Sequence, residues 1–573
     1  MAAECNIQSV TAATWARNAT QGALFAIAAF TLAACSDPSS VNGFSVAPTP
    51  IVVSQSAATR MLEQSSFGAT AQDVAHLQSV GVDAFLNEQF AAAPTGYSGF
   101  TYVDHTAPTS CQYDATAPAG PASLCARDNY TLFQVQRRFF RNALSGSDQL
   151  RQRVAFALSQ IFVVSGTKIN EAYGMAAYQN MLLRDAFGNF RDLLNDVTLS
   201  PVMGNYLDMA NNDKADPVSG TTPNENYARE LLQLFSIGVN LLNLDGSVQT
   251  DAKGRPVPAY SEGVIEGYAY LFTGWTYPPR SATTLQWTNP INYENAMVAV
   301  ANHHDTGPKL ILQDRVLPGG QTPQQDLADG LDAVFNHPNV GPFIGKQLIQ
   351  HLVTSNPSLQ YVARVATVFN NNGKGMRGDM RAVIRAILLD AEARGDAKTD
   401  PSYGHLREPA LFMTSILRTL GGQSDGVYLQ SQADSLQQNL FTSPSVFNYF
   451  PPSYTIAGTT SLGPEFGIHD ATSALSRANF VYQLVYGGGA AAEASVNGST
   501  GTSLDLSAYQ SSAANAETLI MQLNQRMMHG TLSKIASATI AQAVNAVAAT
   551  DTLNRVRMAV YLLASSQQYQ VER

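Results

Sequence analysis

The chain has 573 residues, of which 45% are hydrophobic and only 14% charged, and its formal net charge is −10. This is enough apolar material for a large buried core, and more than one domain is the usual expectation at this length. Because the chain is acidic and contains no long basic run, we expect no nucleic-acid-binding surface.

The first residues predict export. Arg17 precedes a short apolar run that ends in small residues, which is the pattern of a secretory signal peptide. The sequence LAAC at residues 32–35 resembles a bacterial lipobox, in which the cysteine becomes the lipid-bearing first residue. We therefore expect a signal peptide over residues 1–34 and a lipid anchor on Cys35. An ordinary signal peptide that is cleaved nearby, and leaves Cys35 without a role, is the alternative.

A flexible tether is expected over residues 35–56, because this stretch is rich in Ser, Pro, Val and Gly. No later segment approaches about 18 uninterrupted apolar residues, so contact with the membrane is expected through the lipid anchor only. The predicted location is the cell envelope, in the periplasm or on the outer surface.

After the tether, apolar residues recur at steps of three and four, which predicts helices. The second of these helices has a plausible N-cap at Thr70, with Asp73 three residues later. A loop rich in Pro, Gly and Ala then contains Cys111 and Cys125. An even pair of cysteines in an exported loop suggests a disulfide, and two free thiols are the alternative.

Helical patterns continue to Gly238, but residues 240–323 break the rhythm with Asp-Gly and Lys-Gly turns and a Pro/Gly/Asn-rich stretch. Helices resume after residue 323, and a second irregular section covers residues 441–467. The expected fold class is therefore all-α. We expect a single large helical domain over residues 57–573, with two long irregular, aromatic-rich inserts and a small hairpin.

Residues 221–239, TTPNENYARELLQLFSIGV, place several charges at the start of an apolar helix. Thr222 and Glu225 match a capping box, with a proline at the first helical position between them. Arg229 lies four residues after Glu225 and can pair with it on one helix face. Glu230 has no capping explanation. It is a candidate for acid/base catalysis or metal ligation, and a buried ion pair is the alternative.

A second candidate is NHHDTGPK, residues 302–309. His304 and Asp305 could supply metal ligands or a His–Asp acid/base pair, and Lys309 could bind an anionic substrate. The alternative is an Asx-type turn with exposed histidines and a solvated lysine. Aromatic residues around Trp275 in the first insert, and others in the second, could form a platform for a carbohydrate or another polymer, or could simply pack the loops.

The blocks PNENYARELLQLFSIGV, YLFTGWT, HHDTGPK and GKQLIQHLVTSNP follow one another along the chain. Together with the Arg407-Glu408-Pro409 step, they resemble the bacterial family called domain of unknown function 1800, from about residue 57 to the end. The resemblance implies an exported, mostly helical protein and no known reaction. It also implies a partner, because a gene of this family often lies beside one for a second exported protein that resembles the alkaline-phosphatase/sulfatase superfamily.

The family's signature residues are matched at these positions: Asn224, Glu225, Asn226, Arg229, Glu230, Gly274, Trp275, His304, Asp305, Gly307 and Lys309. The sequence SPSVFNYFPP departs from the family pattern, since many members have Gly-Trp after the Ser-Val. Site assignments in that stretch therefore do not follow from the resemblance.

Two functions remain open at this point. In the first, Glu230, His304 and Asp305 converge within roughly 10 Å, around a divalent cation or as acid/base groups, in an enzyme that acts on an extracytoplasmic polymer. Arg229, Lys309 and Trp275 would then hold the substrate. In the second, the protein is a non-catalytic lipoprotein scaffold that binds or assists an exported partner. Its charged signature would then be a buried ion-pair network that fixes the packing of helices.

Overall fold

The computed structural model describes residues 53–103, 121–280, 284–395, 398, 400 and 402–573. This part of the chain is mostly helical, and its only sheets are two-stranded. The all-α fold class is therefore confirmed. One continuous hydrophobic core runs through it, from Ala58 in the first helix to Tyr569 near the last strand. The predicted signal peptide, Cys5, Cys35 and Cys111 lie outside the described residues.

The first half of the described chain forms these helices: α1 Gln55–Ser65, α2 Ala71–Val80, α3 Val82–Ala91, α4 Pro121–Asn129, α5 Phe133–Ser145, α6 Gln149–Ile161, α7 Ala172–Asp185, α8 Phe190–Leu199, α9 Pro201–Tyr206, α10 Asn226–Gln233 and α11 Glu262–Leu271. The second half forms these: α12 Pro323–Asn336, α13 Val340–Leu352, α14 Leu359–Asn370, α15 Met380–Leu389, α16 Pro409–Thr419, α17 Val427–Ser435, α18 Ala471–Val485, α19 Ala516–Met528, α20 Lys534–Asn545, α21 Thr552–Ala564 and α22 Gln567–Gln570.

Short 3₁₀ helices and strands lie between them. The 3₁₀ helices are η1 Ala301–His303, η2 Leu312–Asp314, η3 Pro464–Ile468 and η4 Ser507–Ser512. The antiparallel strand pairs are β1 Trp275–Thr276 with β2 Val298–Ala299, β3 Lys309–Ile311 with β4 Arg315–Leu317, β5 His405–Leu406 with β8 Val571–Glu572, and β6 Gln423–Ser424 with β7 Thr502–Ser503.

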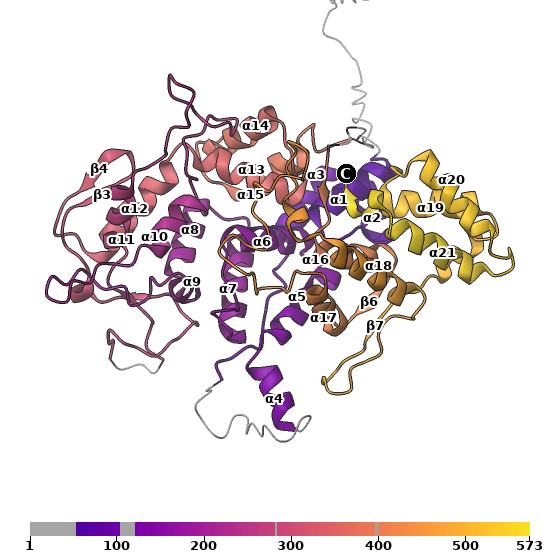
Figure 1. The fold of residues 1–573 in the computed structure, drawn as a ribbon, viewed down its shortest axis with the longest axis horizontal. Helices are drawn as coiled ribbons and strands as arrows, with labels where there is room; N and C mark the ends of the chain where they lie inside the picture. Colours follow the sequence, from indigo (N-terminus) through magenta and orange to yellow (C-terminus); the bar gives the residue numbers. More distant parts are fainter. Residues whose placement is uncertain (1–52, 104–120, 281–283, 396–397, 399, 401) are drawn as a thin grey trace, which may run out of the picture. The chain divides into compact units, whose positions relative to one another are not determined.

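Helix α6 lies in the middle of this arrangement and packs against α7 and α13 (Figure 1). Nearly all its residues are buried, so it serves as the central core helix rather than as a surface helix. The C-terminal helices α19, α20 and α21 pack together at one side (Figure 1). Helix α2 begins where the Thr70 hydroxyl accepts the amide hydrogen of Asp73, at 3.0 Å, which confirms the predicted cap.

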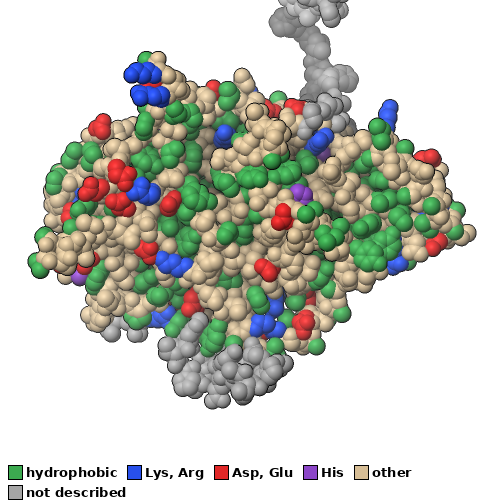
Figure 2. All heavy atoms as spheres, in the orientation of Figure 1, with side chains coloured by type: hydrophobic (Ala, Val, Ile, Leu, Met, Phe, Trp, Pro, Cys, Tyr) green, Lys and Arg blue, Asp and Glu red, His purple; other side chains and the backbone are tan. Residues whose placement is uncertain are grey.

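The irregular inserts form the small sheets that position the candidate site. Residues 240–258 fold back as a hairpin-like excursion, in which the Leu241 amide donates to the Val257 carbonyl at 2.8 Å. The β3–β4 hairpin then lies against α11. Within the described residues, no helix combines the length and the apolar character that crossing a membrane requires. On the face seen in Figure 2, charged side chains are sparse apart from a group of acidic ones, with a basic one beside them, at the left.

Candidate functional site

The charged side chains at the start of α10 form ion pairs that connect this helix to α11. Arg229 Nη2 lies 2.7 Å from Glu225 Oε2 and 2.7 Å from Glu262 Oε1, which belongs to α11. All three side chains are more than a third exposed. Ion pairs in such an environment contribute about 0–1 kcal/mol to stability. Arg229 therefore joins two helices at the surface and is already engaged by two carboxylates.

The predicted capping box at Thr222 and Glu225 is wrong. Helix α10 begins at Asn226, Thr222 is exposed, and no side chain caps the helix at Glu225. The reason lies in Asn224, whose side-chain oxygen accepts the Asn226 amide hydrogen at 2.8 Å in an Asx turn. This turn occupies residues 224–226, so the helix begins about one turn later than a cap at Thr222 would require.

Glu230 is half-buried, and its Oε2 has no hydrogen-bond partner among the described residues. Burial raises the pKa of Glu230, and the nearby charge of Arg229 opposes this rise. Burial and the negative charge of Glu230 raise the pKa of Tyr206. The same two causes raise the pKa of Tyr260 to about 12. Glu230 therefore lies close enough to Tyr206 and Tyr260 to affect their ionisation.

His304 lies in a separate and closed network. Its Nε2 is 2.9 Å from Asp326 Oδ2, and its Nδ1 is 2.9 Å from the Thr273 carbonyl oxygen. Lys309 Nζ reaches the same oxygen of Asp326 at 2.8 Å. The side chains of His304, Asp326 and Lys309 are at most 1% exposed. Both ring nitrogens are occupied by contacts to buried oxygen atoms, so neither is open to a metal or a substrate.

The remaining hydrogen bonds of Lys309 are also internal. Its Nζ donates to the carbonyl oxygens of Asp305 and Gly307 at 2.7 and 2.9 Å. The Asp305 carboxylate accepts the Gly307 amide hydrogen at 2.8 Å, which is the Asx turn considered as the alternative. Lys309 is therefore not accessible to an anionic substrate, and its anionic partners are Asp326 at 2.8 Å and Asp305 at 3.5 Å. Trp275, the other candidate for substrate contact, is only 3% exposed.

The three side chains proposed as metal ligands do not form a site. In the part of the chain that the structure describes, no group of three or more His, Cys, Asp or Glu side chains is placed to hold a metal ion. His304 and Asp305 are neighbours in the closed network, whereas Glu230 is not part of it. Asp326, which completes that network from the first turn of α12, was missed, because an aspartate after a Thr322–Gln325 cap looks like an ordinary helix start.

A larger group of buried charges was also missed. We call it the Arg407 cluster, and it consists of Glu63, His405, Arg407, Glu465, His529 and Glu572. Arg407 lies between Glu63, at 2.9 Å, and Glu572, at 3.0 Å. His405 lies 3.4 Å from Glu465 and 3.8 Å from Glu572, and His529 lies 3.2 Å from Glu63. No side chain of the cluster is more than 5% exposed.

The pKa values in the cluster move in opposite directions. Burial raises the pKa of Glu63 to about 7, against the attraction of Arg407. Burial would also raise the pKa of Glu572. The positive charges of Arg407 and His405 outweigh this effect and lower the pKa of Glu572 to about 2. Burial disfavours a charged His405, yet the carboxylates of Glu465 and Glu572 raise its pKa to about 9. Such opposed shifts occur at functional sites and in structural ion networks alike.

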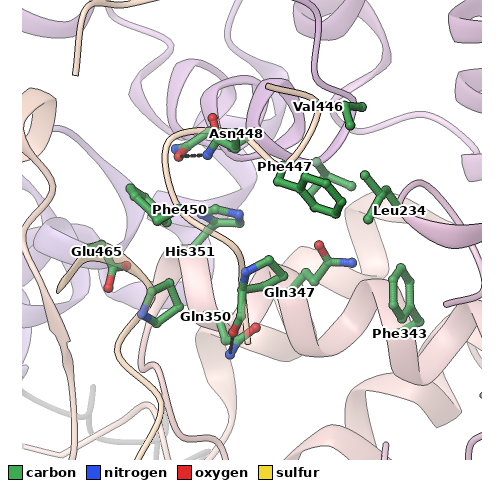
Figure 3. Close-up of a pocket in the computed structure, with 14 residues that line it drawn as sticks. Leu234, Phe343, Gln347, Gln350, His351, Val446, Phe447, Asn448, Phe450 and Glu465 are labelled. Carbon is green, nitrogen blue, oxygen red and sulfur yellow. Dashed lines mark hydrogen bonds between the residues drawn. The ribbon is translucent and has the colours of Figure 1, made fainter. Parts of the chain in front are cut away.

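A small hollow adjoins the cluster at Glu465. It lies between α6, α13 and the second insert, and Figure 3 shows His351, Gln347 and Asn448 around it. Asn448 donates to the Gln160 side-chain oxygen at 2.9 Å. The cavity volume is about 50 Å³, which is room for a few water molecules and well below the several hundred Å³ of a usual ligand pocket.

Several polar atoms at this hollow lack partners. Glu465 Oε2 and Gln347 Nε2, which line it, form no hydrogen bond within the described residues. The same holds for both ring nitrogens of His405, which does not line the hollow but lies 3.4 Å from Glu465. The 3.4 and 3.8 Å separations of His405 from its carboxylates are too long for good hydrogen bonds. Buried polar atoms of this kind call for water or a ligand. Chemically, the arrangement could move a proton between His405 and Glu465.

The comparisons with known proteins give a family and no characterised relative. A family model described as "Protein of unknown function (DUF1800)" matches residues 60–571. No curated protein and no solved structure matches the chain.

Proposed function

We propose that this chain, which belongs to the DUF1800 family of proteins of unknown function, is a non-catalytic scaffold of the cell envelope that binds an exported partner. Its lipid anchor would be Cys35. The observation that carries this proposal is the closed network of His304, Asp326 and Lys309, whose buried charges are engaged by one another. A scaffold requires its charged residues to fix the packing, whereas an acid/base enzyme requires them to reach a substrate.

The partner that we propose is an exported protein resembling the alkaline-phosphatase/sulfatase superfamily. The family resemblance supports this partner. A binding role also agrees with the ion pairs of Arg229, which join two helices instead of lining a reaction site.

The test is co-purification of the full-length lipidated chain from the envelope after mild cross-linking. We expect a stoichiometric complex with an exported phosphatase- or sulfatase-like protein. Arg229→Ala, which removes only a surface clamp, serves as the folded control and should keep the complex. Recovery of the chain alone, at every cross-linker concentration, would contradict the scaffold.

A second candidate function is favoured by one specific observation, the unpartnered atoms of Glu465, which lines the hollow, and of its neighbour His405. An acid/base enzyme acting on an extracytoplasmic polymer could use this pair, with Glu465 accepting a proton that His405 supplies or stabilises. The measurement is release of soluble fragments from envelope polymers by the wild-type chain and by Glu465→Gln. Release that disappears in the folded variant would favour the enzyme, and no release from the wild type would favour the scaffold.

A further inference from the structure

We propose that Arg60, Arg394 and Tyr403 form a binding site for a phosphate group. Arg60 belongs to α1 and is only 1% exposed, whereas Arg394 and Tyr403 lie in the stretch between α15 and α16. Lys398 adds a third positive charge, because its Nζ lies 5.2 Å from the centroid of the Tyr403 ring. None of these residues belongs to the Arg407 cluster or to the network of His304.

The buried donors of this site have no acceptor. Arg60 Nη1 donates to the Gly395 carbonyl oxygen at 3.1 Å, but Arg60 Nε and Nη2 form no hydrogen bond within the described residues. These two nitrogens share one edge of the guanidinium, and such an edge can hold two oxygens of one anion. Arg394 Nε and the Tyr403 hydroxyl also lack a partner in the described part of the chain. Unsatisfied buried donors are rare, so together they indicate an acceptor that binds there.

The positive charges of the site lack a direct counter-charge. Arg394 donates to the uncharged side chain of Gln64. Lys398 donates to the Ala391 carbonyl oxygen at 3.4 Å. Among the residues that the structure describes, neither of them nor Arg60 forms an ion pair with a carboxylate. Burial and the charge of Arg60 lower the pKa of Arg394 to about 10. A water molecule could accept a hydrogen bond here, but an anion would also remove the repulsion between these cations.

The carboxylates whose charges act on Arg60 and Lys398 are engaged elsewhere. Each of them binds an arginine or a serine, in the pairs Glu63–Arg407, Glu572–Arg407, Asp390–Arg364 and Glu392–Ser358. They attract the cations of the site from beyond ion-pair distance. The site therefore keeps positive charge that a bound anion would balance.

The number of donors favours phosphate over a carboxylate. A carboxylate has two oxygens and one negative charge, whereas a phosphate group carries about −1.5 to −2 charges and at least three acceptor oxygens. The site offers two nitrogens of Arg60, one of Arg394, the phenol of Tyr403 and the ammonium of Lys398. Burial raises the pKa of Tyr403 against the charges of Arg60 and Arg394, so the phenol keeps its proton and can donate it.

The site is open on one side. Arg394 and Lys398 are partly exposed, so an anion can enter from their side. Tyr403 also lines a cavity of about 320 Å³, which lies within the range of ligand pockets. Among the described residues that line this cavity, the charged side chains are those of His405 and Arg573, and both are basic. The cavity therefore has room for the remainder of a phosphate monoester and no acidic side chain that would repel it.

The test is calorimetric titration of the full-length chain, solubilised in detergent, with inorganic phosphate, glycerol 3-phosphate and succinate at constant ionic strength. We expect saturable binding of phosphate at one site per chain and much weaker binding of succinate. Arg394→Gln removes a charged donor, and Tyr403→Phe removes only the phenol donor. Each should weaken phosphate binding about tenfold or more. Arg385→Gln is the matched control and should bind as the wild type does, because Arg385 is a surface arginine of α15, 35% exposed, that already pairs with Asp83.

Melting temperatures give a second readout, because an anion that binds only the folded chain stabilises it by mass action. Phosphate should raise the melting temperature of the wild type more than chloride does at equal ionic strength. Arg394→Gln and Tyr403→Phe should lose this difference, and Arg385→Gln should keep it.

The relative affinities of the two phosphates identify the source of the group. Tighter binding of glycerol 3-phosphate supports the site with a monoester as its ligand, and tighter binding of inorganic phosphate supports it with the free ion. The proposal is overturned if neither binds, if succinate binds equally well, or if both site variants keep wild-type affinity while melting at the wild-type temperature. Each of these outcomes leaves the scaffold proposal untouched, because that proposal depends on a protein partner and on co-purification.

Discussion

At the scale of single residues, Asp326 pairs with both His304 and Lys309, so it offers the sharpest test of the closed network. Asp326→Asn keeps the shape of the side chain and removes its charge. Lys309 then remains buried at 1% exposure, with the Asp305 carboxylate 3.5 Å away as its remaining counter-charge. We therefore expect a loss of up to about 3–5 kcal/mol in the free energy of unfolding. The measurement is urea denaturation.

The matched control is Asp329→Asn on the same helix. Asp329 is 38% exposed and lies 3.7 Å from Arg315, so its loss should cost less than about 1 kcal/mol. Equal effects of the two substitutions would show that Lys309 and His304 do not depend on Asp326. In that case the network would lose its structural interpretation.

His405 predicts a pH dependence of stability. Its folded pKa of about 9 exceeds the unfolded value of about 6.5, because the carboxylates of Glu465 and Glu572 outweigh the opposing effect of burial. A raised histidine pKa stabilises the fold fully below about pH 6.5, and this contribution is lost as the pH rises through 9. Unfolding free energies of the wild type should therefore fall between these pH values by an amount on the order of a few kcal/mol.

His405→Gln removes the titrating group, so its unfolding free energy should change less over the same interval, although the variant is less stable at pH 6.5. The comparison of slopes, rather than of absolute stability, isolates this residue from Glu63 and from the other histidines. Parallel slopes for the two proteins would contradict a charged His405 in the fold.

At the scale of elements, the close approach of the 302–309 segment to β1 depends on Gly274. Its φ is +84°, and a Cβ there would lie 2.9 Å from His304 Cβ and 3.0 Å from the His304 backbone. Gly274→Ala therefore combines backbone strain with a clash. We expect it to lower the unfolding free energy by about 1–3 kcal/mol more than a glycine with strain alone.

Gly254→Ala provides that comparison, because Gly254 has a φ of +77° and no atom within 4 Å of its Cβ direction. The two variants share the penalty of a positive φ and differ only in the clash. Thermal denaturation of both measures the difference. If the two melting temperatures coincide, the segment moves away without cost and does not fix His304.

The helices themselves were largely predictable, because their signals are local. Thr70 caps α2 by accepting the amide hydrogen of Asp73, only three residues away. Both residues lie within one short stretch of sequence, so the cap could be predicted. Thr222 carried a similar signal and failed, because Asn224 forms a competing turn that also contacts Asn212, with its amide 2.7 Å from the Asn212 side-chain oxygen. Local patterns therefore predicted the kind of element better than its first residue.

At the scale of the whole molecule, the candidate sites could not be predicted, because they join distant segments. Arg407 meets Glu63 from α1 and Glu572 from β8, near the two ends of the described chain. Only the Arg407-Glu408-Pro409 step marked this region in the sequence.

The lipid anchor is the last prediction, and it concerns how the whole molecule is held in the envelope. If Cys35 is acylated, the wild-type chain should sediment with membranes and require detergent for extraction, because each buried CH₂ of an acyl chain contributes about 0.8 kcal/mol to membrane binding. Cys35→Ser should be released as soluble protein. Cys5→Ser, inside the predicted signal peptide, should remain anchored and controls for cysteine loss.

Intact-mass measurement separates the two interpretations of the first 35 residues. An acylated Cys35 as the first residue supports the lipobox, whereas an unmodified chain that begins nearby supports an ordinary signal peptide. A Cys35→Ser protein that still needs detergent would contradict the anchor. The scaffold proposal would then need another means of holding the protein beside its partner, since no described helix is suited to cross the membrane.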